Sequence, residues 1–168
     1  MKKFPSFDAL LLGALLLLGG CASAPTSTNH GLVGAWRGQV QFKNGAFAEV
    51  KDIEFLYAFN VGGTMTESSN YDGVPPVAPA YGVWRKVGDR TYEARYEYYW
   101  TKAPATFDEL AKGGGWMPGG RGVLVQTITL SADGNNFDST IKHAVFDAQG
   151  KATDPVSEAS AQGARMQF

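Results

Sequence analysis

From Gly31 onward, apolar and polar residues alternate in short runs that end at turn signals. In the run 53–59, every second residue is isoleucine, phenylalanine or tyrosine, while Asp52 and Glu54 fall on the opposite face. A period of two is that of a β-strand with one buried face. Turn sequences such as Lys43-Asn44-Gly45 separate the runs. The pattern therefore predicts one all-β domain over residues 31–168.

Continued along the chain, the pattern predicts strands at residues 32–42, 53–59, 64–69, 81–87, 90–100, 122–131, 136–147 and 158–168. Proline cannot donate to a central ladder, and all eight prolines fall outside these runs. Eight strands in hairpin order most simply close into an antiparallel up-and-down barrel, because closure removes exposed edges. A two-sheet sandwich is the alternative. At most one short helix is expected, in the loop 101–121, where Thr106–Glu109 matches a capping box and Gly113 could end the helix.

In such a meander, every second connection lies at the same end of the barrel. The long connections expected at 70–80, 101–121 and 148–157 therefore share one end, and tight turns occupy the other. An eight-stranded barrel can hold a small ligand, and loops on a rigid scaffold usually carry the site. We expect the mouth at the long-loop end, and the segment before Gly31 at the opposite end.

Residues 1–20 have the features of a signal peptide, because Lys2 and Lys3 precede an apolar run, Ala9–Leu18. A run of this length is too short to span a bilayer, which takes roughly 20 residues. Leu18-Gly19-Gly20-Cys21 resembles the lipobox of bacterial lipoproteins, in which the signal peptide is cut before the cysteine and the thiol carries diacylglycerol.

The lipobox resemblance implies that lipid on Cys21 makes the membrane a partner of this protein. Residues 21–30 are then the lipidated cysteine and a flexible tether. Ala22 stands where an aspartate would retain such a protein in the inner membrane. The expected location is the cell envelope, on the outer membrane facing the periplasm where the cell has one.

Trp36 lies early in the first expected strand and Arg165 late in the last, so a closed barrel brings them together near its closed end. Gly34-Ala35-Trp36 resembles the Gly-x-Trp motif of the lipocalins and wider calycin-like barrels. Arg165 resembles the arginine of their last strand, which packs across that tryptophan. The resemblance implies a lipocalin-like barrel with Trp36 and Arg165 as a structural pair. Residues 58–65 and 81–85 are similar to small bacterial lipocalin-like proteins of unassigned function.

Composition narrows the function classes. The formal net charge is −1 without a basic run, which disfavours nucleic acid as a partner because that binding rests on neutralising phosphates. One cysteine and two histidines exclude an intrachain disulfide, a cysteine-rich metal site and a three-histidine metal site. The sequence contains neither Gly-x-Ser-x-Gly nor a phosphate loop. We therefore predict no catalytic residue, metal or cofactor.

The candidate cavity or mouth residues share the inward faces of the expected strands: Phe55, Tyr57, Met65, Glu67, Tyr96, Tyr98 and His143. Tyrosine has an apolar body and a polar tip, which suits a wet cavity. Glu67 and His143 could bind the polar head of a ligand or act as acid and base, and a lone histidine can also ligate haem. The other interpretation is that the rings simply fill the barrel and that His143 is a core histidine.

The segment Trp116-Met117-Pro118 lies between the glycine runs 113–115 and 119–120. Apolar side chains between glycines could form a lid over the mouth or contact a partner. The other interpretation is that Trp116 folds back and caps the core.

Taken together, these features favour a membrane-anchored, lipocalin-like binding protein that holds a small apolar or amphipathic ligand in the cell envelope. The alternative is a filled barrel that meets envelope proteins through Trp116, Met117 and the loop 71–81. A barrel enzyme, an isomerase or hydrolase working with His143 and Glu67, ranks third.

Overall fold

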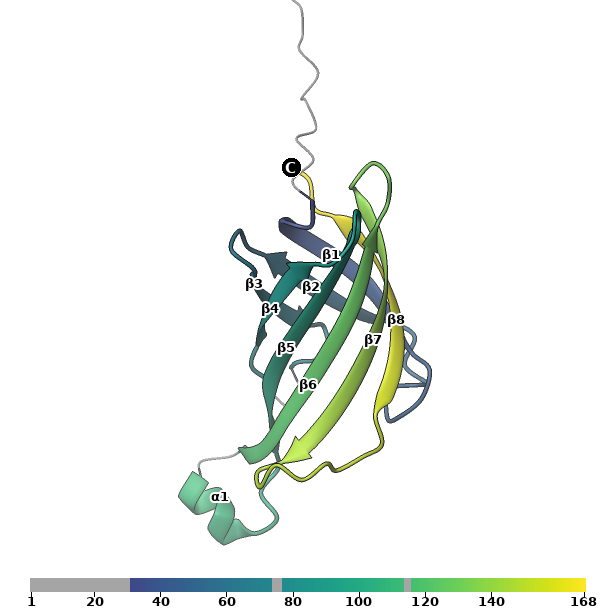
Figure 1. Cartoon of the computed structure of the whole chain (residues 1–168). Coiled ribbons are helices and arrows are strands. Elements are labelled where there is room, and N and C mark those ends of the chain that lie inside the picture. Colours follow the sequence, from purple (N-terminus) through teal and green to yellow (C-terminus); the bar gives the residue numbers. More distant parts are fainter. Residues whose placement is uncertain (1–30, 74–76, 114–115) are drawn as a thin grey trace, which may run out of the picture.

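The computed structural model describes residues 31–73, 77–113 and 116–168, which form a closed antiparallel barrel (Figure 1). Each strand pairs with its neighbours in the chain, and the last strand pairs with the first. The strands are β1 Gly34–Phe42, β2 Ile53–Phe59, β3 Thr64–Ser69, β4 Ala80–Lys86, β5 Thr91–Lys102, β6 Met117–Leu130, β7 Asn136–Asp147 and β8 Ser157–Arg165. The predicted up-and-down barrel is confirmed, and the sandwich alternative is wrong because one ladder runs around the whole set.

The prediction that every proline lies outside a strand is wrong for Pro118. This residue is the second of β6 and lies opposite Thr101, next to a register shift between Trp100 and Thr101 of β5. Proline is tolerated at a strand start or a bulge, where its missing N–H breaks no regular ladder bond. Gly119 also belongs to β6, and a Cβ there would collide with the Trp100 ring. The lack of a side chain at Gly119 therefore leaves space for the Trp100 indole.

One short helix lies in the connection between β5 and β6. It is α1, Phe107–Gly113, and it projects beyond the barrel at the end far from the C-terminus (Figure 1). The N–H of Glu109 donates to Thr106 Oγ1 (3.2 Å), and the N–H of Ala105 donates to Glu109 Oε2 (2.8 Å). These reciprocal bonds are the predicted capping interaction, displaced by one residue on the return side. Within the described ranges, no helix has the length and apolar character needed to cross a membrane.

Large aromatic side chains fill the barrel toward its tight-turn end. Trp36 packs on Phe137 at 5.3 Å between ring centroids, and Tyr57 lies against Phe137 at 5.9 Å and stacks on Phe59 at 5.7 Å. All four rings are at most 2% exposed. They come from β1, β2 and β7, so this half of the interior is a packed core.

A buried polar network crosses this core at Gln126. Its Oε1 accepts from the Tyr96 hydroxyl (3.0 Å), and its Nε2 donates to Ser139 Oγ (2.8 Å) and to the Tyr57 hydroxyl (3.5 Å). Ser139 Oγ in turn donates to the carbonyl of Ala161 (3.4 Å). Because these buried groups have partners, the network fixes the side chains beneath the open half of the barrel.

Arg165 closes the tight-turn end. Its guanidinium lies 4.2 Å from the Trp36 ring centroid and donates to the carbonyls of Gly31, Val33 and Gly134 (2.5, 2.6 and 2.9 Å). Trp36 Nε1 donates to the carbonyl of Leu32 (2.9 Å). The predicted pair is thus present, and it ties the entry of the chain into β1 to the end of β8.

The connections fall at two ends, as strand parity predicts. The tight turns β2–β3, β4–β5 and β6–β7 share the end that Arg165 closes, and the longer connections share the other, called here the loop end. Gly31, the first described residue, lies at the closed end, where its carbonyl accepts from Arg165. The chain therefore enters the barrel opposite the loop end.

Candidate functional site

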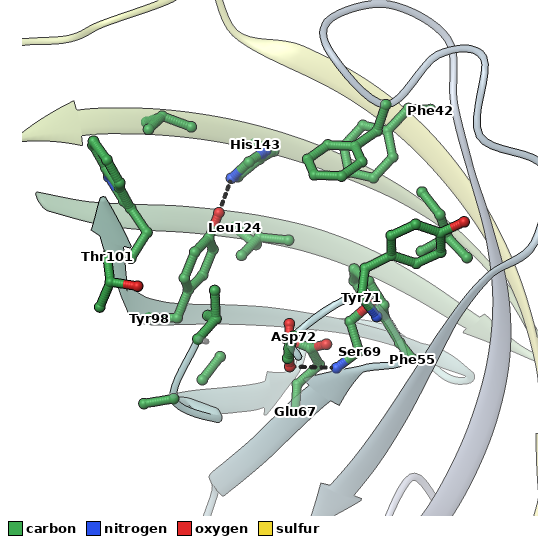
Figure 2. Close-up of a pocket in the computed structure, with 17 residues that line it drawn as sticks. Phe42, Phe55, Glu67, Ser69, Tyr71, Asp72, Tyr98, Thr101, Leu124 and His143 are labelled. Atoms are coloured by element: carbon green, nitrogen blue, oxygen red, sulfur yellow. Dashed lines mark hydrogen bonds between the residues drawn. The ribbon is translucent and has the colours of Figure 1, made fainter. Parts of the chain in front are cut away.

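A cavity of about 370 Å³ opens at the loop end of the barrel (Figure 2). Its walls come from residues near the ends of β1, β3, β5 and β7, residues near the starts of β2 and β4, Leu124 in the middle of β6, and loops at the same end. Most of the wall is apolar, and it includes six aromatic rings: Phe42, Phe47, Phe55, Tyr71, Tyr98 and Trp100.

The cavity exists because the inward-facing side chains are large at the closed end of the barrel and smaller at the loop end. Toward the closed end they carry Trp36 and the aromatic rings packed on it. Toward the loop end they include Ser69, Ala80 and Val145, whose small side chains leave the space between the rings unfilled. Both interpretations of the aromatic interior thus hold, each for one half of the barrel.

Tyr98 and His143 form one wall of the cavity. Tyr98 Oη and His143 Nε2 share a hydrogen bond of 2.9 Å, and the rings lie stacked at 5.9 Å (Figure 2). Gly122 faces Tyr98 across the β5–β6 ladder, and a Cβ at that position would collide with the tyrosine ring. Burial lowers the pKa of His143 and raises the pKa of Tyr98 to about 12, so both side chains are neutral at pH 7.

Glu67 is the buried acid of the cavity. It is only 6% exposed, and its Oε1 is buried without a hydrogen-bond partner. Burial, and to a lesser degree the charge of Asp72, raises the pKa of Glu67 to about 8. The side chain is therefore mostly protonated at pH 7. Buried polar atoms almost always have a partner, so this unpaired oxygen is the most unusual feature of the interior.

Asp72 lies beside Glu67 on the cavity wall opposite His143 (Figure 2). It is held by the N–H of Ser69, which donates to Asp72 Oδ2 at 2.6 Å. The preceding residue in the chain, Tyr71, donates its hydroxyl to Asp52 (2.5 Å), and its ring lies 6.5 Å from the Phe47 ring between centroids. Tyr71 and Phe47 are partly exposed, so they form an aromatic rim at the mouth.

The structure brings four of the seven predicted cavity residues together on the wall: Phe55, Glu67, Tyr98 and His143. The other three, Tyr57, Met65 and Tyr96, point inward as expected but lie in the filled half, at most 2% exposed. The sequence interpretation missed Asp72, Tyr71 and Phe47. Their place in the chain could have identified them, because they lie in loops at the end of the barrel where the mouth is predicted.

The two candidate lid residues lie apart from the cavity wall. Met117 begins β6 and pairs with Lys102. Trp116, the residue before it in the chain, is 44% exposed. Neither residue lines the cavity. Cys21 and the predicted signal peptide fall outside the described residues. In the described part of the chain, no group of three or more histidine, cysteine, aspartate or glutamate side chains could hold a metal ion.

The fold and the site define an up-and-down β-barrel that is packed at one end and hollow at the other. Comparisons with protein-family models, curated proteins and solved structures found no match for the chain. The lipocalin resemblance therefore rests on the barrel topology and on the Trp36–Arg165 pair.

Proposed function

We propose that this protein binds a small, largely apolar molecule with one polar group in the cavity at the loop end. The observation that carries the proposal is the unpartnered Oε1 of Glu67, buried in an otherwise apolar wall. Leaving a buried polar atom unpaired costs about 1–3 kcal/mol. A ligand with a polar group at that depth would supply the missing partner and recover part of that cost.

The size and lining of the cavity set the scale of the ligand. Small-molecule sites usually enclose about 300–1,000 Å³ and combine apolar walls with a few polar groups. A volume of about 370 Å³ lies at the small end of that range. The aromatic walls favour a flat or linear apolar body, and the rim of Phe47 and Tyr71 lies where it would enter.

The location of the barrel follows from the lipobox resemblance. In this proposal, lipid on Cys21 anchors the protein in the cell envelope, on an outer membrane facing the periplasm where one exists. Gly31 enters the barrel at the closed end, so the cavity opens away from the point of attachment. Such a protein would hold its ligand in the aqueous space beside the membrane.

The proposal is tested by titrating the purified protein with N-phenylnaphthylamine, an uncharged dye that fluoresces in apolar surroundings. Wild type should bind the dye at a single site. Ala80→Phe, which adds a ring to the cavity wall, should abolish binding. Ala35→Phe, on the exposed face of β1, is the matched control and should bind as wild type. Equal binding by all three proteins would place the dye outside the cavity and contradict the proposal.

A second candidate function is supported by exposed apolar side chains at the same end. Phe107 and Leu110 of α1 are 79% and 45% exposed, and Trp116 is 44% exposed. A protein partner in the envelope could cover them, which is one use of exposed apolar groups. Under this proposal, Trp116→Ser removes a crosslinked partner in cells without changing dye binding. An identical crosslinking pattern with and without the substitution would eliminate it.

A further inference from the structure

Among the described residues, the cavity wall holds carboxyl groups but no lysine or arginine to pair with them. The carboxyl groups are those of Glu67 and Asp72. Of the lining residues that the structure describes, only His143 has a basic side chain, and burial lowers its pKa, which keeps the imidazole neutral at pH 7. A ligand that carried a carboxylate or a phosphate would find acids and no cation in this wall.

The two acids are placed to act on one ligand group. Asp72 is close enough for its negative charge to disfavour ionisation of Glu67, and Figure 2 shows both carboxyl groups on the same wall. The Oε1 of Glu67 is buried and unpaired, whereas Asp72 Oδ2 accepts a hydrogen bond from the N–H of Ser69. A positive group between them would relieve the repulsion and supply hydrogen bonds at the same time.

The aromatic walls suit the same kind of ligand. The rings of Phe55 and Tyr98 line the cavity from β2 and β5, and Phe42 faces His143 from β1. An organic cation is attracted to aromatic faces, and the attraction grows where water is excluded. A buried acid and aromatic walls, with no lysine or arginine among the described lining residues, together suit an apolar amine.

We propose that the occupant of this cavity is an organic amine, an apolar body with one ammonium group that binds between Glu67 and Asp72. The inference deepens the proposed function and rests on it. On binding, the ammonium keeps its protons and donates hydrogen bonds to the carboxyl oxygens. Glu67 releases its own proton to the solvent, so the buried pair that results is ammonium and carboxylate.

The release of that proton makes binding dependent on pH. Because the pKa of Glu67 is about 8, about one Glu67 in ten is ionised at pH 7 and about nine in ten at pH 9. The other titratable groups facing it are Asp72 in the β3–β4 loop, Tyr57 on β2, Tyr96 and Tyr98 on β5, and His143 on β7. Burial raises the pKa of each tyrosine and lowers that of His143, so these four stay neutral over this range.

The test compares three ligands with the same apolar chain: octylamine, octanol and octanoate. Each displaces N-phenylnaphthylamine from the purified protein at pH 7. Octylamine should bind about tenfold more tightly than octanol, and octanoate should bind most weakly. Octyltrimethylammonium, whose charge does not depend on pH, should gain up to about tenfold in affinity between pH 7 and pH 9, whereas octanol should not change.

Two substitutions assign the preference to the acids. Glu67→Gln should reduce octylamine affinity to that of octanol and leave octanol unchanged. Asp72→Asn keeps a side-chain oxygen for the N–H of Ser69 and should weaken the preference in part. Glu158→Gln, on the exposed face of β8, is the control and should behave as wild type.

The outcomes separate this inference from the proposed function. If octanol or octanoate binds as tightly as octylamine, or if Glu67→Gln keeps the amine preference, the ligand class is wrong while the cavity remains a binding site. If neither the dye nor any octyl compound binds, the proposed function fails and this inference fails with it.

Discussion

Replacing Glu67 with glutamine should stabilise the fold, and by an amount that grows with pH. The structure buries this carboxyl and leaves its Oε1 without a partner. Burial disfavours the charged form, which is why the pKa of Glu67 rises from its ordinary value of 4.5 to about 8. Glutamine has nearly the same shape and never carries the charge, so it avoids the cost of keeping a proton that the unfolded chain would give up.

The sign and size follow from proton linkage. Between pH 4 and pH 7, the unfolded chain loses the proton of Glu67 while the folded chain retains it. The unfolded state therefore binds fewer protons, and stability falls as pH rises through this window. With pKa values of 4.5 and about 8, the loss between pH 4 and pH 7 is about 3 kcal/mol. Glu67→Gln should be free of that loss, and the decline of wild type should level off above pH 8.

The assay is urea unfolding at pH 4, 5, 6 and 7, followed by tryptophan fluorescence. The free energy of unfolding of Glu67→Gln, minus that of wild type, should grow by about 3 kcal/mol across the series, with unchanged m values. Glu158→Gln, on the exposed face of β8, should give a difference close to zero at every pH. A Glu67→Gln difference that stays constant from pH 4 to pH 7 would refute the reasoning, because Glu67 would then titrate alike in both states.

Three further predictions follow from other parts of the molecule. Gly122→Ala should push the Tyr98 ring from its place and lower dye affinity about tenfold in a fluorescence titration; unchanged affinity would mean that the ring position does not matter. Arg165→Ala should lower the free energy of urea unfolding by about 2–3 kcal/mol, because it removes the contact with Trp36 and several bonds to carbonyls; a loss below 0.5 kcal/mol would argue against a structural role. Cys21→Ser should move the protein from the membrane fraction to the soluble fraction, and retention in the membrane would contradict lipid anchoring.

Much of the fold could be predicted from the sequence, because every second residue of a half-buried strand is apolar. The run 53–59 shows this most directly, since its alternate aromatic and aliphatic side chains are the buried ones. The end of the barrel that carries the long loops and the cavity could also be predicted, because it depends only on the number of strands between connections. The Trp36–Arg165 pair could be placed on the same grounds.

What the sequence could not predict depends on contacts between distant residues. Pro118 and Gly119 were assigned to a loop, because their fit in β6 depends on a register shift and on the Trp100 ring. The border between the filled and hollow halves depends on which side chains meet across the barrel. Glu67 was expected inside, but its lack of a partner, and the approach of Asp72, appear only in three dimensions.

The central claim is that the loop end holds a small molecule, and native mass spectrometry of protein purified without added ligand tests it most directly. We expect a reproducible extra mass on wild type and on Ala35→Phe. That mass should be absent from Ala80→Phe, whose added ring occupies the cavity. A wild-type protein that shows only its own mass and also fails to bind N-phenylnaphthylamine would contradict the account.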